Sequence, residues 1–91
     1  MTKISSIYEL IEDMRSHFGW DQTDTKEFVV NCIVEEAKEL KEAFYEKSKE
    51  DVLDELADVL SYAFTLAKMY DVDIYDLIKH KMDIVKGRHY D

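Results

Sequence analysis

The feature that most constrains the fold is the near absence of residues that interrupt a helix. The chain of 91 residues has no proline, and its only glycines stand at positions 19 and 87. Proline removes a backbone donor and glycine weakens a helix interior, so long helices are permitted almost everywhere. Apolar residues also recur at the spacing of one helix face. These observations predict an all-α fold with four helices, at residues 4–18, 25–46, 48–70 and 73–86.

Capping residues stand at the expected helix boundaries. Asp24 with Glu27 forms an acidic variant of a capping box ahead of the second helix, and Ser48 and Asp73 open the third and fourth. Residues 20–24 are expected to form a polar turn. Since short turns favour antiparallel neighbours, the sequence predicts a four-helix bundle-like fold in which the second and third helices form a hairpin.

Five carboxylates are concentrated in this predicted hairpin. The stretches EEAKEL and DELADVL carry them: Glu35, Glu36, Glu39, Glu55 and Asp58. At about 100° per residue, Glu36 and Glu39 lie within about 60° of each other and continue the apolar row of their helix. Glu55 and Asp58 border the apolar row of the next helix. Carboxylates held together on apolar faces repel one another, and burial adds to the cost. A divalent cation removes both problems, and such oxygens suit Mg²⁺ or Mn²⁺.

A solvated helix face is the alternative explanation for these acids. Its weakness is that other residues already supply the polar faces of both helices. They are Lys38, Lys41, Glu42 and Glu46 on the first of the pair, and Lys49, Glu50 and Asp54 on the second.

The charge distribution restricts the possible partners. The net charge is −9, and residues 35–58 contain ten acids and four bases, so that −6 of it lies there. This balance argues against a nucleic-acid backbone or an anionic membrane as a partner. It is compatible with a phosphate substrate if metal ions bridge the two.

Basic residues gather only near the end of the chain. Lys81 and Arg88 belong to this group and are candidates to bind phosphate oxygens. The alternative is that they only complement the dipole at the end of the fourth helix.

Cysteine usage and hydropathy suggest a reducing compartment. Cys32 is the only cysteine, so no intramolecular disulfide can form, and its place on an apolar stripe indicates a small buried hydrophobe. No apolar run approaches transmembrane length and no signal peptide is evident. A cytoplasmic location is therefore expected.

The order of these residues is similar to that of a known family. The pattern EExxE followed by ExxD, formed here by the five carboxylates, resembles the MazG-like nucleotide pyrophosphohydrolases of the all-α NTP pyrophosphatase superfamily. Trp20-Asp21 followed by Thr25 resembles the WDxxxT stretch that precedes this motif in MazG proper. Residues 81–84 and then Arg88 resemble the end of the related dCTP pyrophosphatases.

The resemblance implies an all-α enzyme that hydrolyses nucleoside triphosphates, ribo- or deoxyribo-, to monophosphate and pyrophosphate. Cleansing of the nucleotide pool is the role that this activity suggests. All five carboxylates are candidate catalytic residues. Of these, Glu35 would orient or deprotonate the attacking water, and the Mg²⁺ ligands would be Glu36, Glu39, Glu55 and Asp58. The candidate substrate-binding residues are Trp20, Lys81 and Arg88.

Two other functions remain open. One is a metal-dependent hydrolase acting on something other than a common nucleotide, and the other is a non-catalytic acidic helical protein that binds a metal or a partner. In each case residues 1–91 are expected to form a single domain. The four helices offer more apolar surface than one small bundle covers, which predicts a homodimer or homotetramer, as the family resemblance also implies. The third helix and part of the first are expected to form the interface.

Overall fold

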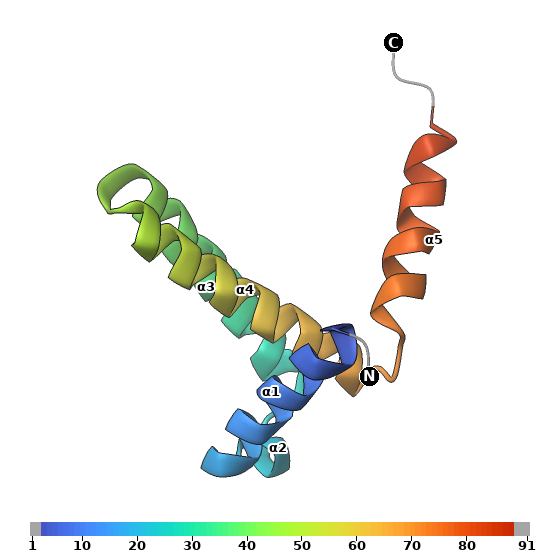
Figure 1. The fold of residues 1–91 in the computed structure, drawn as a ribbon, viewed down its shortest axis with the longest axis horizontal. Helices are drawn as coiled ribbons and strands as arrows, with labels where there is room; N and C mark the ends of the chain where they lie inside the picture. The colour runs from blue at the N-terminus through green and yellow to red at the C-terminus, as the bar shows by residue number, and fades with distance from the viewer. Residues whose placement is uncertain (1–2, 89–91) are drawn as a thin grey trace.

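The computed structural model describes residues 3–88, and within them every regular element is helical. The elements are α1 (Lys3–Phe18), α2 (Trp20–Thr23), α3 (Lys26–Glu46), α4 (Lys49–Met69) and α5 (Ile74–Lys86) (Figure 1). The predicted all-α class is confirmed, and four of these helices match the predicted ones within a few residues. None of the helices in this part of the chain is long and apolar enough to cross a membrane.

Short polar side chains set the helix starts. Ser48 and Asp51 form a complete capping box at α4, with the Asp51 backbone N–H donating to Ser48 Oγ at 3.3 Å. Asp73 caps α5 by accepting from the Asp76 N–H at 2.9 Å. Both starts were predicted from the sequence.

The start of α3 differs from the prediction. Thr25, and not Asp24, is the N-cap, since its hydroxyl accepts from the Phe28 N–H at 3.1 Å. The Asp24 carboxylate instead pairs with Arg15 of α1. A charged partner from another helix attracts this carboxylate more strongly than a neutral backbone donor does.

Residues 20–23 form a single helical turn where a polar turn was expected. Gly19 separates this turn from α1 and has a φ of 73°, in the left-handed region that glycine enters without steric cost. The chain therefore reverses sharply between α1 and α2, which lie against each other (Figure 1).

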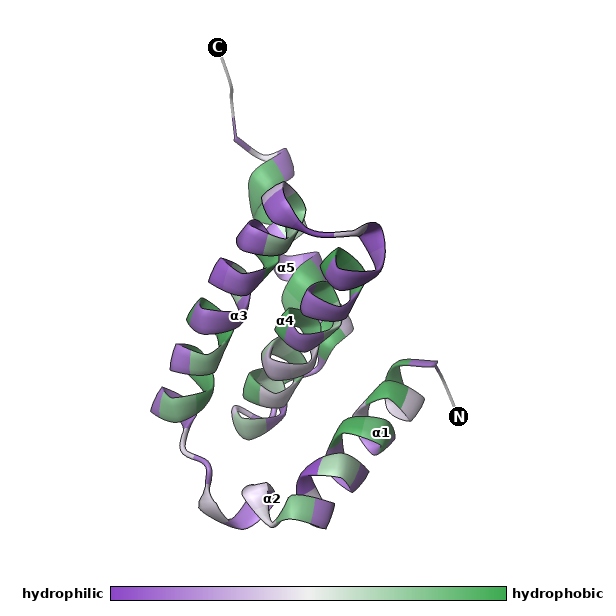
Figure 2. Ribbon diagram, turned by 90° about the vertical axis from the view of Figure 1, so that its left-hand side faces the viewer, coloured by the Kyte–Doolittle hydropathy of each residue, from purple (hydrophilic) through white to green (hydrophobic). Residues whose placement is uncertain are grey.

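The antiparallel hairpin of α3 and α4 is the main packed unit. It buries Val29 and Ala43 of α3 and Ala67 of α4. Helix α1 crosses α4, where Ile11 is buried and the Tyr8 ring meets the Phe64 ring edge-on at 5.5 Å between centroids. Figure 2 shows hydrophobic and hydrophilic residues alternating along these helices, as expected for helices that are each buried on one side.

The position of α5 differs from the expected four-helix bundle. This helix leaves the end of α4 through a turn in which Asp71 has a φ of 57°, and it extends away from the hairpin (Figure 1). Ile74 is buried at its start, but Leu77, Ile78 and Met82 remain exposed. Within one chain α5 is not packed lengthwise against another helix. The short connection was predicted correctly, but the left-handed turn directs α5 away from the other helices.

Candidate metal centre

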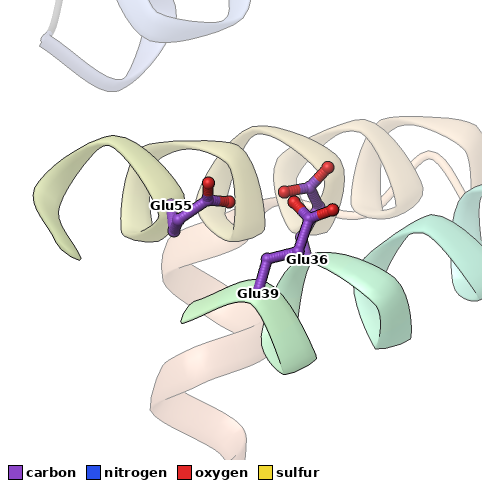
Figure 3. A group of neighbouring side chains, drawn as sticks. All are labelled: Glu36, Glu39 and Glu55. Atoms are coloured by element: carbon purple, nitrogen blue, oxygen red, sulfur yellow. The ribbon is translucent and has the colours of Figure 1, made fainter. Parts of the chain in front are cut away.

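The hairpin brings three of the five predicted carboxylates together. Glu36 and Glu39 come from α3 and Glu55 comes from α4, and one oxygen of each lies within 4.8 Å of the others. Figure 3 shows the three side chains gathered where the two helices face each other. Glu36 and Glu55 are half-buried, whereas Glu39 is exposed. We call these three residues the carboxylate cluster.

Two oxygen atoms of the cluster are buried without a hydrogen-bond partner. They are Oε2 of Glu36 and Oε2 of Glu55. An ionised carboxylate can only accept hydrogen bonds, so neighbouring carboxylates cannot satisfy one another unless a proton is shared. Buried polar atoms without partners are rare and call for an explanation. A divalent cation fits here because it supplies both the missing partner and the opposing charge.

The local electrostatics favour a proton on the cluster when no cation is bound. Burial raises the pKa of Glu36 from 4.5 to about 7, assisted by the neighbouring carboxyl groups of Glu39, Glu55 and Asp58. Burial also raises the pKa of Glu55, and the nearby carboxyl groups of Glu39 and Asp58 raise it further. These acids therefore resist full ionisation together, the behaviour expected of closely placed carboxylates.

Asp58 lies one turn after Glu55 on α4 and outside the tightest group. Its side chain is exposed, but its charge acts on Glu36 and Glu55. Tyr62, one further turn along, was not singled out from the sequence. Burial raises the pKa of its phenol, and Cys32, Glu36 and Asp58 add to the effect. Tyr62 therefore borders the acidic group, and the only sequence signal for it was its four-residue spacing from Asp58.

Glu35 points elsewhere. Its side chain is 68% exposed, and Oε1 accepts from Lys38 Nζ at 3.4 Å. The structure does not bring this predicted residue into the carboxylate cluster.

Trp20 lies beside Asp58. A cavity of about 270 Å³ is lined by both residues, together with Arg15, Tyr62 and others. The Trp20 ring also stacks on Phe18, with 4.8 Å between centroids and 20° between planes. The structure thus places Trp20 on a cavity that it shares with Asp58 and with none of the other four predicted carboxylates.

Lys81 and Arg88 do not reach the cluster within one chain. Lys81 lies on α5 and Arg88 follows it, both exposed, and α5 extends away from the hairpin (Figure 1). Their predicted contact with phosphate therefore stays a prediction.

The protein is all-helical in its described part, and its α3–α4 hairpin brings three carboxylates together. Two of their oxygens are buried without a partner, which makes the cluster a candidate site for a divalent cation. The MazG nucleotide pyrophosphohydrolase domain matches residues 24–91, about three quarters of the chain, and the protein belongs to that family. The family consists of nucleotide-directed hydrolases that generally depend on a metal. No curated protein matches the chain. The family match begins at Asp24, so α1 and α2 precede it.

Proposed function

We propose that this protein is a Mg²⁺-dependent pyrophosphohydrolase that converts a nucleoside triphosphate, ribo- or deoxyribo-, into the monophosphate and pyrophosphate. One observation carries the proposal: Glu36, Glu39 and Glu55 converge within 4.8 Å, with two buried oxygens that lack partners, in a chain of the MazG family. The same chemistry accommodates Mn²⁺ in place of Mg²⁺.

Glu36, Glu39, Glu55 and Asp58 are the residues that would hold the metal. When bound, Mg²⁺ neutralises phosphate oxygens and lowers the pKa of a nearby water. The water oxygen forms a bond to phosphorus, the α–β phosphoanhydride bond breaks, and pyrophosphate leaves. We retain Glu35 as the proposed acceptor of the water's proton. Its ion pair with Lys38 is solvent-exposed and does not hold it firmly in its present orientation.

The remaining parts of the proposed site concern the substrate and the assembly. Trp20 beside Asp58 offers an aromatic surface for the base. We propose a homodimer or homotetramer, supported by the exposed apolar residues of α5, which have no cover within the described chain. Lys81 and Arg88 are proposed to bind phosphate in that assembly. A location in the cytoplasm also belongs to the proposal.

Pyrophosphate release tests the enzyme against a non-catalytic metal-binding protein. Purified protein is incubated with a panel of common and modified nucleoside triphosphates, with Mg²⁺ or with EDTA. Mg²⁺-dependent release of pyrophosphate and monophosphate in equal amounts is expected for at least one nucleotide. Binding of Mg²⁺ without hydrolysis of any nucleotide would favour the non-catalytic alternative, and release of orthophosphate would indicate cleavage at a different bond.

A further inference from the structure

Arg15 has an environment that differs from that of the other paired cations. Its side chain is only 9% exposed, and Nη1 donates to Asp24 Oδ2 at 3.0 Å, where Asp24 is 12% exposed. In the other ion pairs found within residues 3–88, both side chains are more than half exposed. A buried charge is costly unless it is paired and hydrogen-bonded, so this pair constrains the chain locally.

The second hydrogen bond of Arg15 is directed at Trp20. Nη2 donates to the backbone carbonyl oxygen of Trp20 at 3.3 Å. One guanidinium therefore joins three segments, namely α1, the first residue of α2, and the residue before the N-cap of α3. A single helical turn such as α2 is too short to be stable alone. Its position must therefore come from contacts of this kind and from the left-handed turn at Gly19.

The position of Trp20 matters because Trp20 lines a cavity that Asp58, one of the proposed metal ligands, also lines. Trp20, Asp58 and Tyr62 line the cavity of about 270 Å³, and a smaller one of about 170 Å³ lies between Trp20, Asp24, Phe28 and Tyr62. Asp58 and Tyr62 both interact electrostatically with Glu36. Asp58 and Tyr62 therefore belong both to this cavity and to the electrostatic surroundings of Glu36, which makes the cavity our candidate place for the base of a nucleotide whose phosphates are bound at the carboxylate cluster.

We propose that Arg15 is a positioning residue of the nucleotide site. Through its ion pair with Asp24 and its hydrogen bond to the Trp20 carbonyl, it holds the Trp20 ring as the aromatic wall that takes the base. The inference rests on the proposed function for the identity of the substrate. Trp20 was already a candidate from its resemblance to the WDxxxT stretch, whereas Arg15 lies before the family match, which begins at Asp24, and its role is assigned from the geometry of this chain alone.

Trp20 is the only tryptophan of the chain, so intrinsic fluorescence reports directly on its position. Arg15→Met is expected to shift the emission to the red and to increase quenching by acrylamide. Arg15→Lys retains the charge but lacks the two separate nitrogens that make the two bonds, so it should give an intermediate result. The control is Glu12→Gln on the same helix, because it removes only the exposed ion pair with Lys68 and should leave the emission unchanged.

Arg15→Met leaves the Asp24 charge buried and alone, and it can prevent folding. A second variant, Arg15→Met with Asp24→Leu, removes both charges and avoids that cost. Far-UV circular dichroism should show helix content equal to wild type, while the fluorescence of Trp20 still changes because its carbonyl has lost the Arg15 donor and keeps only the backbone N–H at position 24. A role in stability alone predicts a folded double variant with unchanged fluorescence and unchanged kinetics.

The kinetic test uses the best substrate of the nucleotide panel with Mg²⁺. The double variant should raise KM about tenfold, within the energy of one base–aromatic stack, and leave kcat within about twofold. Trp20→Leu should have a similar effect, and adding it to the double variant should raise KM no further.

An unchanged KM in the folded double variant would overturn the inference, whether or not the fluorescence changes. Unchanged fluorescence would overturn it as well. If wild-type protein hydrolyses no nucleotide, the proposed function fails and the assignment of the base to this wall fails with it. The fluorescence series still decides separately whether Arg15 positions Trp20.

Discussion

At the scale of single residues, the structure distinguishes the acids of the carboxylate cluster, which converge between α3 and α4, from acids of the same helices that lie outside it. Glu36 and Glu39 share α3 with Glu42, which is exposed and outside the cluster. All three are glutamates within two helical turns, and only their orientation toward α4 differs. Matched substitutions can therefore distinguish the site from the general acidity of the hairpin.

Glu39→Gln is expected to lower the turnover number by about 100-fold or more, because a site ligand loses its charge. Asp58→Asn should do the same. The helical signal should remain, since removing repulsion between acids does not unfold the hairpin. The controls are Glu42→Gln and Asp54→Asn, which should retain wild-type turnover. Near-normal turnover of either site variant at saturating Mg²⁺ would contradict the assignment.

Glu36 gives the metal-free protein a distinctive pH dependence. Its pKa rises from 4.5 to about 7 on folding, so the folded state binds the proton more tightly than the unfolded state. The resulting stabilisation is fully present below pH about 4.5 and is lost as the pH rises through about 7. In EDTA the melting temperature should therefore fall between pH 5 and pH 8. Glu36→Gln should flatten this decline, and an equally steep decline in the variant would assign it to other groups.

The sequence predicted which acids belong to the candidate site, but it did not predict the direction of each side chain. Spacing placed Glu36 and Glu39 near each other, because helix geometry fixes the angle between residues three or four apart. The predicted hairpin then brought Glu55 of the next helix toward them. The sequence did not reveal that Glu35 turns to Lys38. It also missed the ion pair of Arg15 with Asp24, because this pair joins α1 to the residue before the N-cap of α3 and leaves no periodic signal.

At the scale of elements, the cluster joins α3 to α4 across the hairpin. A cation that binds acids from both helices should therefore act as a cross-link of the folded state. At a hundredfold excess of Mg²⁺ over its Kd, mass action contributes about 2.7 kcal/mol, which raises the melting temperature on the order of 10 °C. Differential scanning fluorimetry with Mg²⁺, compared with NaCl at equal ionic strength, measures this. Equal shifts with both salts would argue against a metal site.

The long helices were predictable because their apolar spacing persists over several turns. Helix α2 was not predicted, since four residues contain too little periodicity to distinguish a helical turn from a polar one. The N-cap of α3 was misplaced by one residue because the competing partner of Asp24 lies on α1. Local sequence signals thus predict the helix boundaries well, except where a side chain from a distant part of the sequence binds the expected capping residue.

At the scale of the whole molecule, α5 is the helix whose apolar face is not covered by other helices of the described chain. Its residues Leu77, Ile78 and Met82 are exposed along one connected helix. The sequence predicted this helix and its boundaries, but not its direction. The prediction of a four-helix bundle assumed that the apolar faces are covered within one chain. The local sequence does not specify whether a second copy of the chain covers them instead.

Light scattering after size exclusion, at micromolar concentration, should give at least twice the mass of one chain. Ile78→Glu should shift the protein toward the monomer, because it places a charge within the exposed apolar face of α5. The control is His80→Glu, which adds the same charge at a polar position of this helix. A wild-type monomer that is fully active would show that assembly is not needed for the site.

The raised pKa of Glu36 also links cation binding to acidity. Because burial and the neighbouring carboxyl groups raise this pKa to about 7, the metal-free protein carries a proton on this group in part of the molecules at neutral pH. Cation binding must displace the proton from those molecules, so isothermal calorimetry should show a binding heat that varies with the ionisation enthalpy of the buffer. Below pH 7 the apparent affinity for Mg²⁺ should fall about tenfold per pH unit for one displaced proton. Acidification would thus switch the hairpin from holding a cation to holding a hydrogen ion.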